Sequence, residues 1–479
     1  MKQIFARLSR RLIRAQLART SPASLLKLGG KKALRCFQRA AGQSGAYRTL
    51  LEEAGVDPSR IRTVADFITH CPLLEKANTF RRFNISDLIA KDIRPERIAS
   101  ILTSSGHGAN GYALGLSTRA QMTSTPAMID LGLDMAFNTD RYRTLLINCL
   151  PMGVTFQSNA VCVANVSVRE DMACAIVEQA GALFDQIILC GDPLFLKRLC
   201  DYSQAKGLDW GRYRMNVVIG EETFSESFRA YLATRLGINL DDDAGGMIGS
   251  SMGVGELGLN LFNETRETIA LRRACSQSAA LLADVCGASA GNGPLPTFLG
   301  FNPLRTFAEI ISPDADGIGD LVITVLDLQA PVPLMRYRTG DRASLIDHHT
   351  LLTCIAKHAL KCAPPSLPVI ALHGRAKDVL PDSWHVDLFK SALYLQPDIA
   401  RQLSGAFRIA IKDGRVSWKV QRAQDASADC LQTAAALKEC ILNMQGSHTL
   451  PLDVECFDYP KFPYGQSIDY ERKFSYWVE

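Results

Sequence analysis

The stretch DLVITVLDLQAPVPLMRYRTGD, from Asp320 to Asp341, decides the fold more than any other part of the chain. Its β-branched and apolar run from Leu321 to Val325 predicts a buried strand. Two prolines follow shortly afterwards and mark a turn, because proline has no backbone N–H to donate to a strand or a helix. The stretch therefore predicts a strand and a turn that lead into a strongly polar RYRTGD terminus.

Short apolar strands alternate with helical stretches from about residue 97 onward, and such alternation predicts parallel sheets covered by helices. The expected strands are Ile98–Leu102, Thr144–Leu150, Gln186–Cys190 and Val217–Ile219. After Gly374 the pattern changes to that of a small α+β unit. Its expected elements are strands near Phe407–Ile411, Val416–Val420 and Pro451–Cys456 and a helix across Cys430–Met444.

These patterns predict an α/β fold class with a large domain and a small one. We expect residues 1–95 to form a basic helical segment packed on the large domain. Residues 96–373 are expected to form its core of mixed or parallel β-sheets covered by helices. Residues 374–479 are expected to form a small, mobile α+β lid, joined by a hinge near residues 373–380.

The composition is that of an ordinary globular chain, with 479 residues, 47% apolar and 21% charged. No apolar run reaches the roughly 18–20 residues that a membrane span needs. The fourteen cysteines are scattered and form no CxxC pair. With no secretory signal, they are expected to be reduced and mostly buried, as in a cytoplasmic protein, and a zinc site would need distant residues to come together.

Charge is distributed unevenly along the chain. Residues 1–51 contain 12 Lys or Arg residues and no acid, so the rest of the chain is net acidic within a total of +4. Within residues 1–20, apolar residues recur at roughly helical spacing among arginines. Such a helix can lie on an anionic membrane surface or meet an acidic protein, it can resemble a transit peptide, or it can simply cover the large domain. The apolar residues are Ile4, Phe5, Leu8, Leu12 and Ile13.

Four further segments are rich in glycine or polar residues. Glycine and serine after a strand let backbone N–H groups and small hydroxyls surround phosphate oxygens. A loop at the carboxyl end of a parallel strand is where ligands bind in open α/β sheets. The plainer interpretations are a turn for the first segment and, for the second, a helix start capped by Ser225. The segments are TSSGHGANG (Thr103–Gly111), GEETFSE (Gly220–Glu226), GSSMGVGELG (Gly249–Gly258) and GRAKDVL (Gly374–Leu380).

The third segment also matches two general motifs. GVGELG fits the dinucleotide pattern GxGxxG, which should open a first βαβ unit rather than lie in the middle of a chain. GSSMG fits the hydrolase pattern GxSxG, with Ser251 as the nucleophile and an acid and a histidine further on. Chain order alone leaves the hydrolase alternative open, because several histidines follow: His348, His349, His358, His373, His385 and His448.

In this order, with Asp320–Asp341 before the last of them, the segments resemble those of the adenylate-forming ligases (the acyl-CoA synthetase or AMP-dependent ligase superfamily), especially the phenylacetate-CoA ligases. Ala46–Phe83 is similar to the helical N-terminal segment of that branch, and the resemblance runs from about residue 46 to the C-terminus. It implies that residues 96–373 form an adenylate-binding core and that residues 374–479 form a lid that rotates.

The resemblance implies a nucleotide site for ATP. Asp341 would accept hydrogen bonds from both ribose hydroxyls, Arg375 would reach the nucleotide, and Lys377 would be the pivot of the lid. Lys473 would swing in to neutralise charge at the α-phosphate, with Arg472 as the fallback. The other residues implied to bind the nucleotide are Thr103, Ser104, Ser105 and Gly106 in the phosphate loop, Glu221, Glu222 and Thr223 beside the adenine, and Ser251, Met252 and Gly253.

The resemblance also implies a metal-side carboxylate, Glu256, because Mg²⁺ bridging phosphates takes oxygen ligands. The sequence departs from the family at several positions. Asn110 stands where the phosphate loop usually has a lysine, and Met252 and Gly255 stand where tyrosine and serine are usual. Residues 381–385, PDSWH, replace the glycine-containing loop that lines the thiol channel.

The implied reaction is ATP-dependent activation of a carboxylic acid to an acyl-adenylate with release of pyrophosphate, followed by transfer to a thiol. CoA is the family default as acceptor. The alternatives are the phosphopantetheine arm of an acidic acyl carrier protein, attracted by the basic N-terminus, and an amine. A different class of function is a non-catalytic adenylate-binding or membrane-surface protein. We expect no nucleic-acid partner. The apolar wall expected to hold an aromatic or fatty acid comprises Met152, Gly153, Phe156, Met247 and Ile248.

Overall fold

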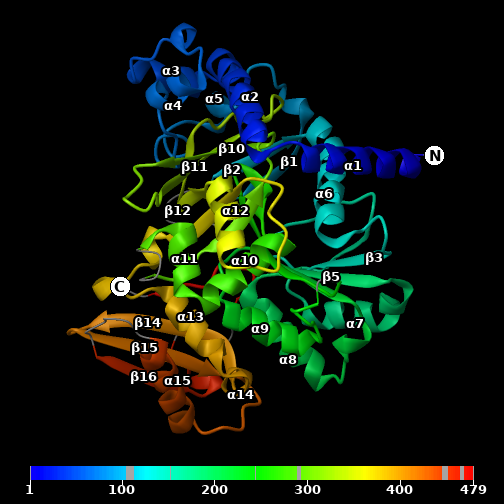
Figure 1. Ribbon diagram of the computed structural model, residues 1–479, viewed down its shortest axis with the longest axis vertical. Coiled ribbons are helices and arrows are strands. Elements are labelled where there is room, and N and C mark those ends of the chain that lie inside the picture. The colour runs from blue at the N-terminus through cyan, green and yellow to red at the C-terminus, as the bar shows by residue number, and fades with distance from the viewer. Residues whose placement is uncertain are drawn as a thin grey trace.

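The computed structural model describes residues 2–103, 113–151, 153–242, 244–288, 293–444, 451–463 and 469–477. The N-terminal helices α2 to α5 gather at the β10 end of a long sheet, whereas α1 runs out past α6 (Figure 1). Local sequence determines where they begin: Ser21 caps α2, and Thr63 caps α4 in a capping box with Asp66. These helices are α1 (Lys2–Arg19), α2 (Pro22–Gln43), α3 (Gly45–Glu53), α4 (Val64–His70) and α5 (Ile85–Leu88).

An eleven-stranded sheet runs through the molecule in the order β10-β11-β12-β13-β9-β8-β7-β6-β5-β3-β4. Pairing is antiparallel from β10 to β7 and parallel from β7 to β4, so the sheet changes character at β7. The parallel half contains β3 (Thr144–Asn148), β4 (Cys162–Asn165), β5 (Gln186–Gly191), β6 (Met215–Ile219) and β7 (Ile248–Val254). The antiparallel half contains β8 (Gly258–Asn263), β9 (Thr297–Phe301), β10 (Thr306–Ile311), β11 (Gly319–Val325), β12 (Tyr337–Ile346) and β13 (Val369–Arg375).

Both faces of the parallel half are covered, as alternation along its strands requires. Leu145 and Ile187 face the core formed with α7, α8 and α9, whereas Leu146 and Ile188 face the core formed with Phe137 of α6. Three further helices pack on the antiparallel half. The bounds are α6 (Arg119–Phe137), α7 (Glu170–Ala180), α8 (Pro193–Ala205), α9 (Glu226–Leu236), α10 (Arg266–Gln277), α11 (Ala279–Cys286) and α12 (His348–Lys357). The predicted fold class is confirmed.

One predicted strand lies elsewhere. β1 (Ile98–Thr103) does not join the parallel sheet but pairs antiparallel with β2 (Leu114–Thr118) in a separate two-stranded sheet. Its residues alternate between half-buried and exposed, and Ile101 is 61% exposed. A strand of a covered parallel sheet is buried on both faces. The prediction that β1 belongs to that sheet is therefore wrong.

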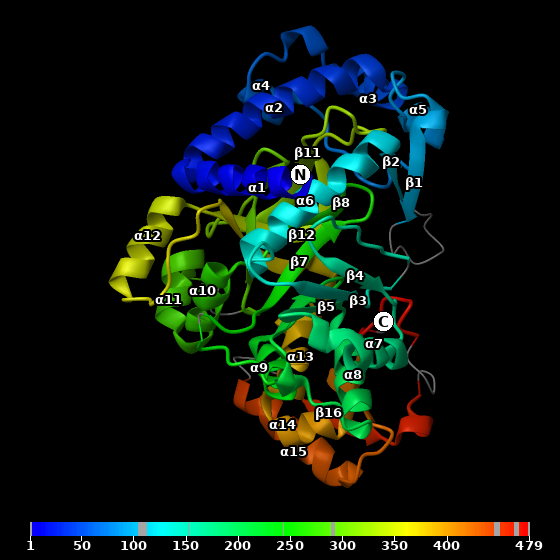
Figure 2. The same cartoon turned by 90° about the vertical axis from the view of Figure 1, so that its right-hand side faces the viewer.

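The elements after β13 form what we call the C-terminal unit. The three predicted strands and the predicted helix all form. The unit is packed through α13 on α9: the Tyr394 ring centroid is 4.6 Å from that of Phe228 and 5.3 Å from that of Tyr231. Figure 2 shows α13 beside α9. The elements are α13 (Val386–Leu395), α14 (Pro397–Arg401), β14 (Leu403–Lys412), β15 (Arg415–Arg422), α15 (Cys430–Met444) and β16 (Leu452–Phe457).

All fourteen cysteines are free and most are buried, as predicted. Burial raises the pKa of the Cys36 and Cys71 thiols to about 11, so these thiols stay protonated at neutral pH. Within the described ranges, no helix combines the length and the apolar character that crossing a membrane requires.

Candidate active site

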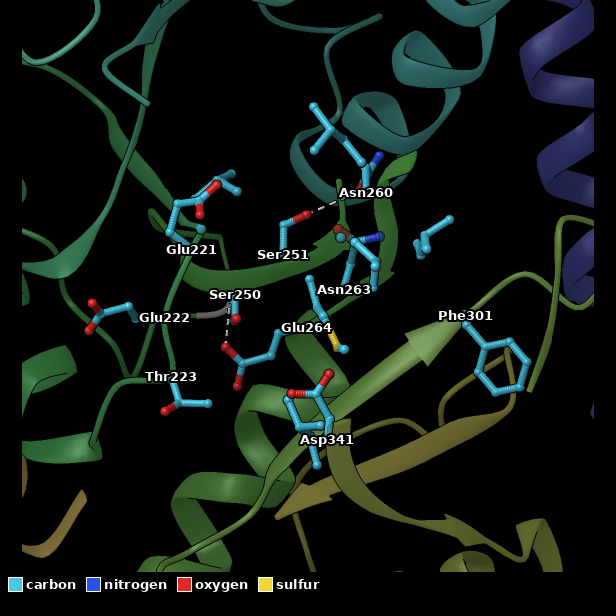
Figure 3. A pocket seen from close by; sticks show the side chains of 18 of the residues that line it. Glu221, Glu222, Thr223, Ser250, Ser251, Asn260, Asn263, Glu264, Phe301 and Asp341 are labelled. Atoms are coloured by element: carbon cyan, nitrogen blue, oxygen red, sulfur yellow. Dashed lines mark hydrogen bonds between the residues drawn. The ribbon is translucent and has the colours of Figure 1, made fainter. Parts of the chain in front are cut away.

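A cavity of about 1870 Å³ lies where the sheet changes from parallel to antiparallel pairing. Its walls include the loop after β6, the hairpin of β7 and β8, the neighbouring parts of β12 and β13, and residues of the C-terminal unit. Figure 3 shows Glu221, Glu222 and Thr223 from the loop after β6 and Asp341 from β12 among the side chains that line it. The carboxyl ends of parallel strands are where open α/β sheets bind ligands, so we take this cavity as the candidate active site.

Asp341 is held in the cavity wall by a charged partner. It pairs with Arg375 across β12 and β13, and Arg375 Nε donates a hydrogen bond of 3.0 Å to Asp341 Oδ1. Gly340, immediately before it, has φ +83°, a conformation that favours glycine. Burial opposes the charge on Arg375, but the Asp341 carboxylate outweighs this effect and raises the pKa of Arg375. A hydrogen-bond acceptor held in a fixed position by Arg375 therefore lines the cavity.

Glu256 lies in the turn between β7 and β8 and is nearly buried. Tyr337 Oη donates a hydrogen bond of 2.6 Å to Glu256 Oε1, and Lys76 Nζ is 3.7 Å from the same oxygen. Burial and then the Glu256 charge raise the pKa of Tyr337, so its hydroxyl remains a donor. In the ranges that the structure describes, no group of three or more His, Cys, Asp or Glu side chains could hold a metal ion by itself. Mg²⁺ commonly uses one or two carboxylates together with substrate phosphates, and Glu256 fits that mode of binding.

Two lysines of the C-terminal unit contact the loop after β6. Lys473 Nζ is 3.3 Å from Glu221 Oε2, and Lys390 Nζ is 3.0 Å from Glu222 Oε2. Burial opposes the charge on Lys390, but the carboxylates of Glu222, Asp387 and Asp378 together outweigh it and raise the pKa of Lys390. Thr223 Oγ1 donates a hydrogen bond of 3.3 Å to an Asp387 oxygen. The loop predicted to contact the adenine is therefore enclosed by the C-terminal unit.

Asp192 lies behind the same loop at the start of α8, where its Oδ1 accepts a hydrogen bond of 3.0 Å from the Phe195 N–H. Burial, and then the nearby charges of Glu222 and Glu221, raise the pKa of Asp192 to about 7. This carboxyl group therefore changes its charge near neutral pH.

Ser251 and Met252 lie inside strand β7, and Gly253 follows them before the turn into β8. Ser251 Oγ donates a hydrogen bond of 3.3 Å to Asn260 Oδ1 (Figure 3). A hydrolase elbow places its serine on a turn from a strand to a helix, and a dinucleotide motif opens a helix. GSSMGVGELG instead forms an antiparallel hairpin, so both alternative interpretations of this segment are excluded.

A buried ion network supports the hairpin from behind. The Arg229 side chain is fully buried and its Nη2 is 2.8 Å from Glu264 Oε1 and 2.9 Å from Glu226 Oε1. Glu264 Oε2 in turn accepts a hydrogen bond of 2.8 Å from the Ser250 N–H. The plainer interpretation of Ser225 is confirmed as well, since its hydroxyl caps α9. Removing one partner of such a network leaves a buried charge unpaired, so the network fixes β7 and α9 relative to each other.

Only part of the predicted substrate wall lies in the wall of the cavity. Phe156 and Met247 line the cavity. Ile248 is fully buried in the core on the other face of the sheet, because successive side chains of a strand point to opposite faces. Gly153 is exposed and does not line the cavity. The predictions for Ile248 and Gly153 are therefore wrong, and Met152 lies outside the described residues.

The predicted phosphate loop begins at Thr103, which lines the cavity at the end of β1. Ser104, Ser105 and Gly106 lie outside the described residues. Lys377, the predicted pivot, lies in the short 3₁₀ turn after β13 and also lines the cavity. Burial, and then the charge of Arg375, lower the pKa of Lys377.

Sequence reasoning missed several residues of the cavity. Lys76 precedes the large sheet by many residues, and only the fold brings it to Glu256. Lys390 had a signal, because it is a lone charge within the apolar run LFKSALYL of α13. The apolar side chains that α6 contributes to the cavity wall had no sequence signal beyond an ordinary helical pattern. Further apolar lining residues are Met128, Leu133, Phe137, Leu146, Leu150 and Leu259, together with Leu17 and Ala18 of α1.

No protein-family model and no curated protein matches the sequence. Among solved structures, the chain is similar to 2-hydroxyisobutyryl-CoA ligase in the postadenylation state in complex with R3-HIB-AMP, with a TM-score of 0.64 and 12% identity over 96% of this chain and 89% of that chain. The same ligase in the thioesterification state with 2-HIB-AMP and CoA gives a TM-score of 0.56 and 14% identity over 95% and 90% of the two chains. Its open conformation in complex with 2-HIB-AMP and CoA gives a TM-score of 0.55 and 13% identity over 96% of this chain and 91% of that chain.

These similarities show that the chain has the fold of the adenylate-forming ligases. The resemblance drawn from the sequence is confirmed at the level of the fold.

Proposed function

We propose that the protein activates a carboxylic acid with ATP to an acyl-adenylate, releasing pyrophosphate, and then transfers the acyl group to a thiol. One observation carries the proposal. The side chains that the reaction requires come from three distant parts of the chain and meet in one cavity: Asp341 with Arg375, Glu256 with Tyr337, and Lys473 at the loop after β6.

In the first step, a carboxylate oxygen of the acid attacks the α-phosphorus of ATP. A new phosphorus–oxygen bond forms and the bond to the bridging oxygen of pyrophosphate breaks. Asp341 accepts hydrogen bonds from the ribose hydroxyls, and Thr103 lies on the side of the phosphates. Lys473 stabilises the negative charge that gathers on the α-phosphate. Phosphoryl-type transfer depends mainly on such positioning and charge stabilisation.

Glu256 is the residue that would hold Mg²⁺ together with the nucleotide phosphates. A bound Mg²⁺ neutralises phosphate charge and orients the phosphates for in-line attack. Lys76, 3.7 Å from Glu256 Oε1, adds positive charge on the same side of the cavity. This placement supports Lys76 as the cation that compensates for Asn110, which stands where the phosphate loop usually has a lysine.

The carboxylic acid would lie against Phe156, Met247 and the apolar side chains of α6. Ligand pockets are mostly apolar, with a few polar groups that fix orientation. A wall of this kind suits an aromatic ring or an aliphatic chain. The size of the cavity leaves room for an acyl group beside the nucleotide.

In the second step, a thiol sulfur attacks the carbonyl carbon of the adenylate and AMP leaves. CoA is the proposed acceptor, with a phosphopantetheine arm on an acidic carrier protein or an amine as alternatives. Rotation of the C-terminal unit about Lys377 would expose the adenylate, but it must first separate Tyr394 from α9. The TM-score is higher to the postadenylation state than to the thioesterification state, which supports an arrangement of the C-terminal unit that precedes the transfer step.

The test is carboxylate-dependent exchange of labelled pyrophosphate into ATP, measured over a panel of aromatic and fatty acids. Asp341→Ala is expected to lower the exchange rate by about 10²–10³-fold, because it removes a charged, preorganised hydrogen-bond acceptor. Asp398→Ala is the matched control, since the Asp398 side chain is 96% exposed on the C-terminal unit. Exchange at the wild-type rate in Asp341→Ala would reject the assignment. Binding of ATP without exchange for any acid would indicate a non-catalytic adenylate-binding protein instead.

A further inference from the structure

α1 is attached to the body of the protein through its charged residues. Arg14 Nη1 is 2.5 Å from Asp134 Oδ2, and Arg10 forms an ion pair with Asp140 and lies 3.9 Å from Asp130. These aspartates lie on α6 or just after it, and Asp130 and Asp134 are buried. Buried ion pairs depend strictly on geometry. They therefore fix which face of α1 is turned towards the protein.

The opposite face of α1 is apolar and exposed. Ile4 is 64% exposed, Phe5 69%, Leu8 50% and Leu12 72%. Their spacing places them on one side of a helix, and we call them the outer stripe. Single exposed apolar residues are common on protein surfaces, but a contiguous apolar face of this kind marks a contact site. The amphipathic pattern is thus reversed relative to an ordinary surface helix.

The surroundings of the outer stripe are basic. Arg11 and Arg19 are exposed on the same helix, and Arg7 keeps a 57% exposed side chain although its Nε lies 3.6 Å from Asp140 Oδ1; no acidic residue occurs before Glu52. A second copy of the chain would bring arginines against arginines, so the charge disfavours self-association through this face. Figure 1 shows α1 projecting past α6, with its N-terminal end away from the body. The outer stripe is therefore accessible to an extended surface.

We propose that α1 docks the protein on an anionic membrane surface. The outer stripe enters the boundary between headgroups and acyl chains, and the exposed arginines contact lipid phosphates. Helices that lie in this interface combine an apolar face with flanking arginines or lysines. Each arginine near an anionic surface contributes about fivefold to binding. This inference goes beyond the proposed ligase activity and does not depend on it.

The test is co-sedimentation of the full-length protein with vesicles. Binding is expected to vesicles that mix phosphatidylcholine with phosphatidylglycerol, to weaken with added salt, and to be much weaker with phosphatidylcholine alone. The double variant Phe5→Ser/Leu12→Ser is expected to lower the partition coefficient by at least about tenfold, because two large apolar side chains no longer enter the interface. Leu431→Ser is the matched control, since Leu431 is 81% exposed on α15, away from α1.

Unfolding temperature and pyrophosphate exchange are measured on the double variant and on the Leu431→Ser control to verify that each remains folded. Equal binding to neutral and anionic vesicles, or equal binding by the double variant and the wild type, would overturn the proposal. Sedimentation velocity supplies a further check. Dimers of the wild type that the double variant abolishes would assign the outer stripe to a second copy of the chain. Binding of an acidic carrier protein through α1, without vesicle binding, would assign it to a protein partner.

Discussion

The two ends of the chain pack on the same central body in opposite ways. α1 turns Arg10 and Arg14 inward onto α6 and leaves the outer stripe exposed. The C-terminal unit turns Tyr394 inward onto α9 and directs Lys390 and Lys473 to the edge of the cavity. In α1 the charged side chains make the attachment and the outer stripe is left for another contact. In the C-terminal unit an aromatic side chain makes the attachment and the lysines are left for the cavity. The comparison thus separates residues that hold a segment in place from residues that meet a ligand or a surface.

The difference also determines how each attachment responds to conditions. Ion pairs weaken with salt where water reaches them, whereas apolar burial does not. We therefore expect the C-terminal unit to stay attached under conditions that loosen α1. The four predictions below test this contrast, beginning with the largest expected effect.

Tyr394→Ala should break the apolar attachment of the C-terminal unit. Tyr394 is buried against Phe228 and Tyr231, and truncating a buried aromatic side chain costs about 3–5 kcal/mol. Chemical denaturation should show this loss, and a separate early transition would show that the unit detaches first. Tyr394→Phe keeps the ring and is expected to cost no more than about 1.5 kcal/mol. Unchanged stability in Tyr394→Ala would mean that the rings do not carry the attachment.

Lys473→Ala should spare the attachment and impair the chemistry. The lysine is the cation proposed to stabilise charge on the α-phosphate, and loss of one such group typically costs about 10²–10³-fold in rate. Pyrophosphate exchange measures the effect, with the unfolding temperature as a check on folding. Arg472→Ala is the matched control, because the Arg472 side chain is 86% exposed and pairs with Asp469. Loss of exchange in Arg472→Ala alone would transfer the role to the arginine.

Much of this contrast could not be predicted from the sequence. The strands of the C-terminal unit and the helix at Cys430–Met444 follow from local periodicity, and so does the run Leu321–Val325, which lies within β11. Which face of α1 is turned towards the protein does not follow from local periodicity. Its pattern alone suggests that the apolar side is buried, but the partners that reverse it, Asp130 and Asp134, lie more than 100 residues away.

The residues of the candidate active site could likewise be predicted only where local sequence identifies them. Segments that carry their own chemistry in a few consecutive residues, such as the one ending at Asp341, were recognisable. Lys76 and the α6 wall reach the cavity only through tertiary packing, so no local signal identified them. Ile248 was misplaced because a run of apolar residues does not reveal which face of a strand each of them occupies.

Asp192→Asn tests the electrostatic cost of burying a carboxyl group behind the loop after β6, which the C-terminal unit contacts. Because the pKa of Asp192 is raised to about 7, the folded protein holds this proton more tightly than the unfolded chain does. Between the unfolded pKa and about pH 7, stability contributed by this group therefore falls as pH rises. Asparagine keeps the helix cap and removes the charge, so the variant should be more stable at pH 8 by about 1.4 kcal/mol or more. Identical pH profiles of the unfolding temperature for wild type and variant would contradict this.

Arg14→Ala gives the smallest expected effect and tests the ionic attachment of α1. The arginine is partly exposed, whereas Asp134 is buried and also accepts a hydrogen bond of 2.9 Å from the Asp140 N–H. We expect a loss of about 1 kcal/mol, confined to α1. Hydrogen exchange of the α1 amides should accelerate about fivefold and become less sensitive to salt, while exchange in α13 stays unchanged. Arg11→Ala removes an exposed arginine of the same helix and should leave the α1 amides as protected as in the wild type. If the two variants behave alike, the inward ion pairs do not hold α1, and the contrast between the two ends fails at this point.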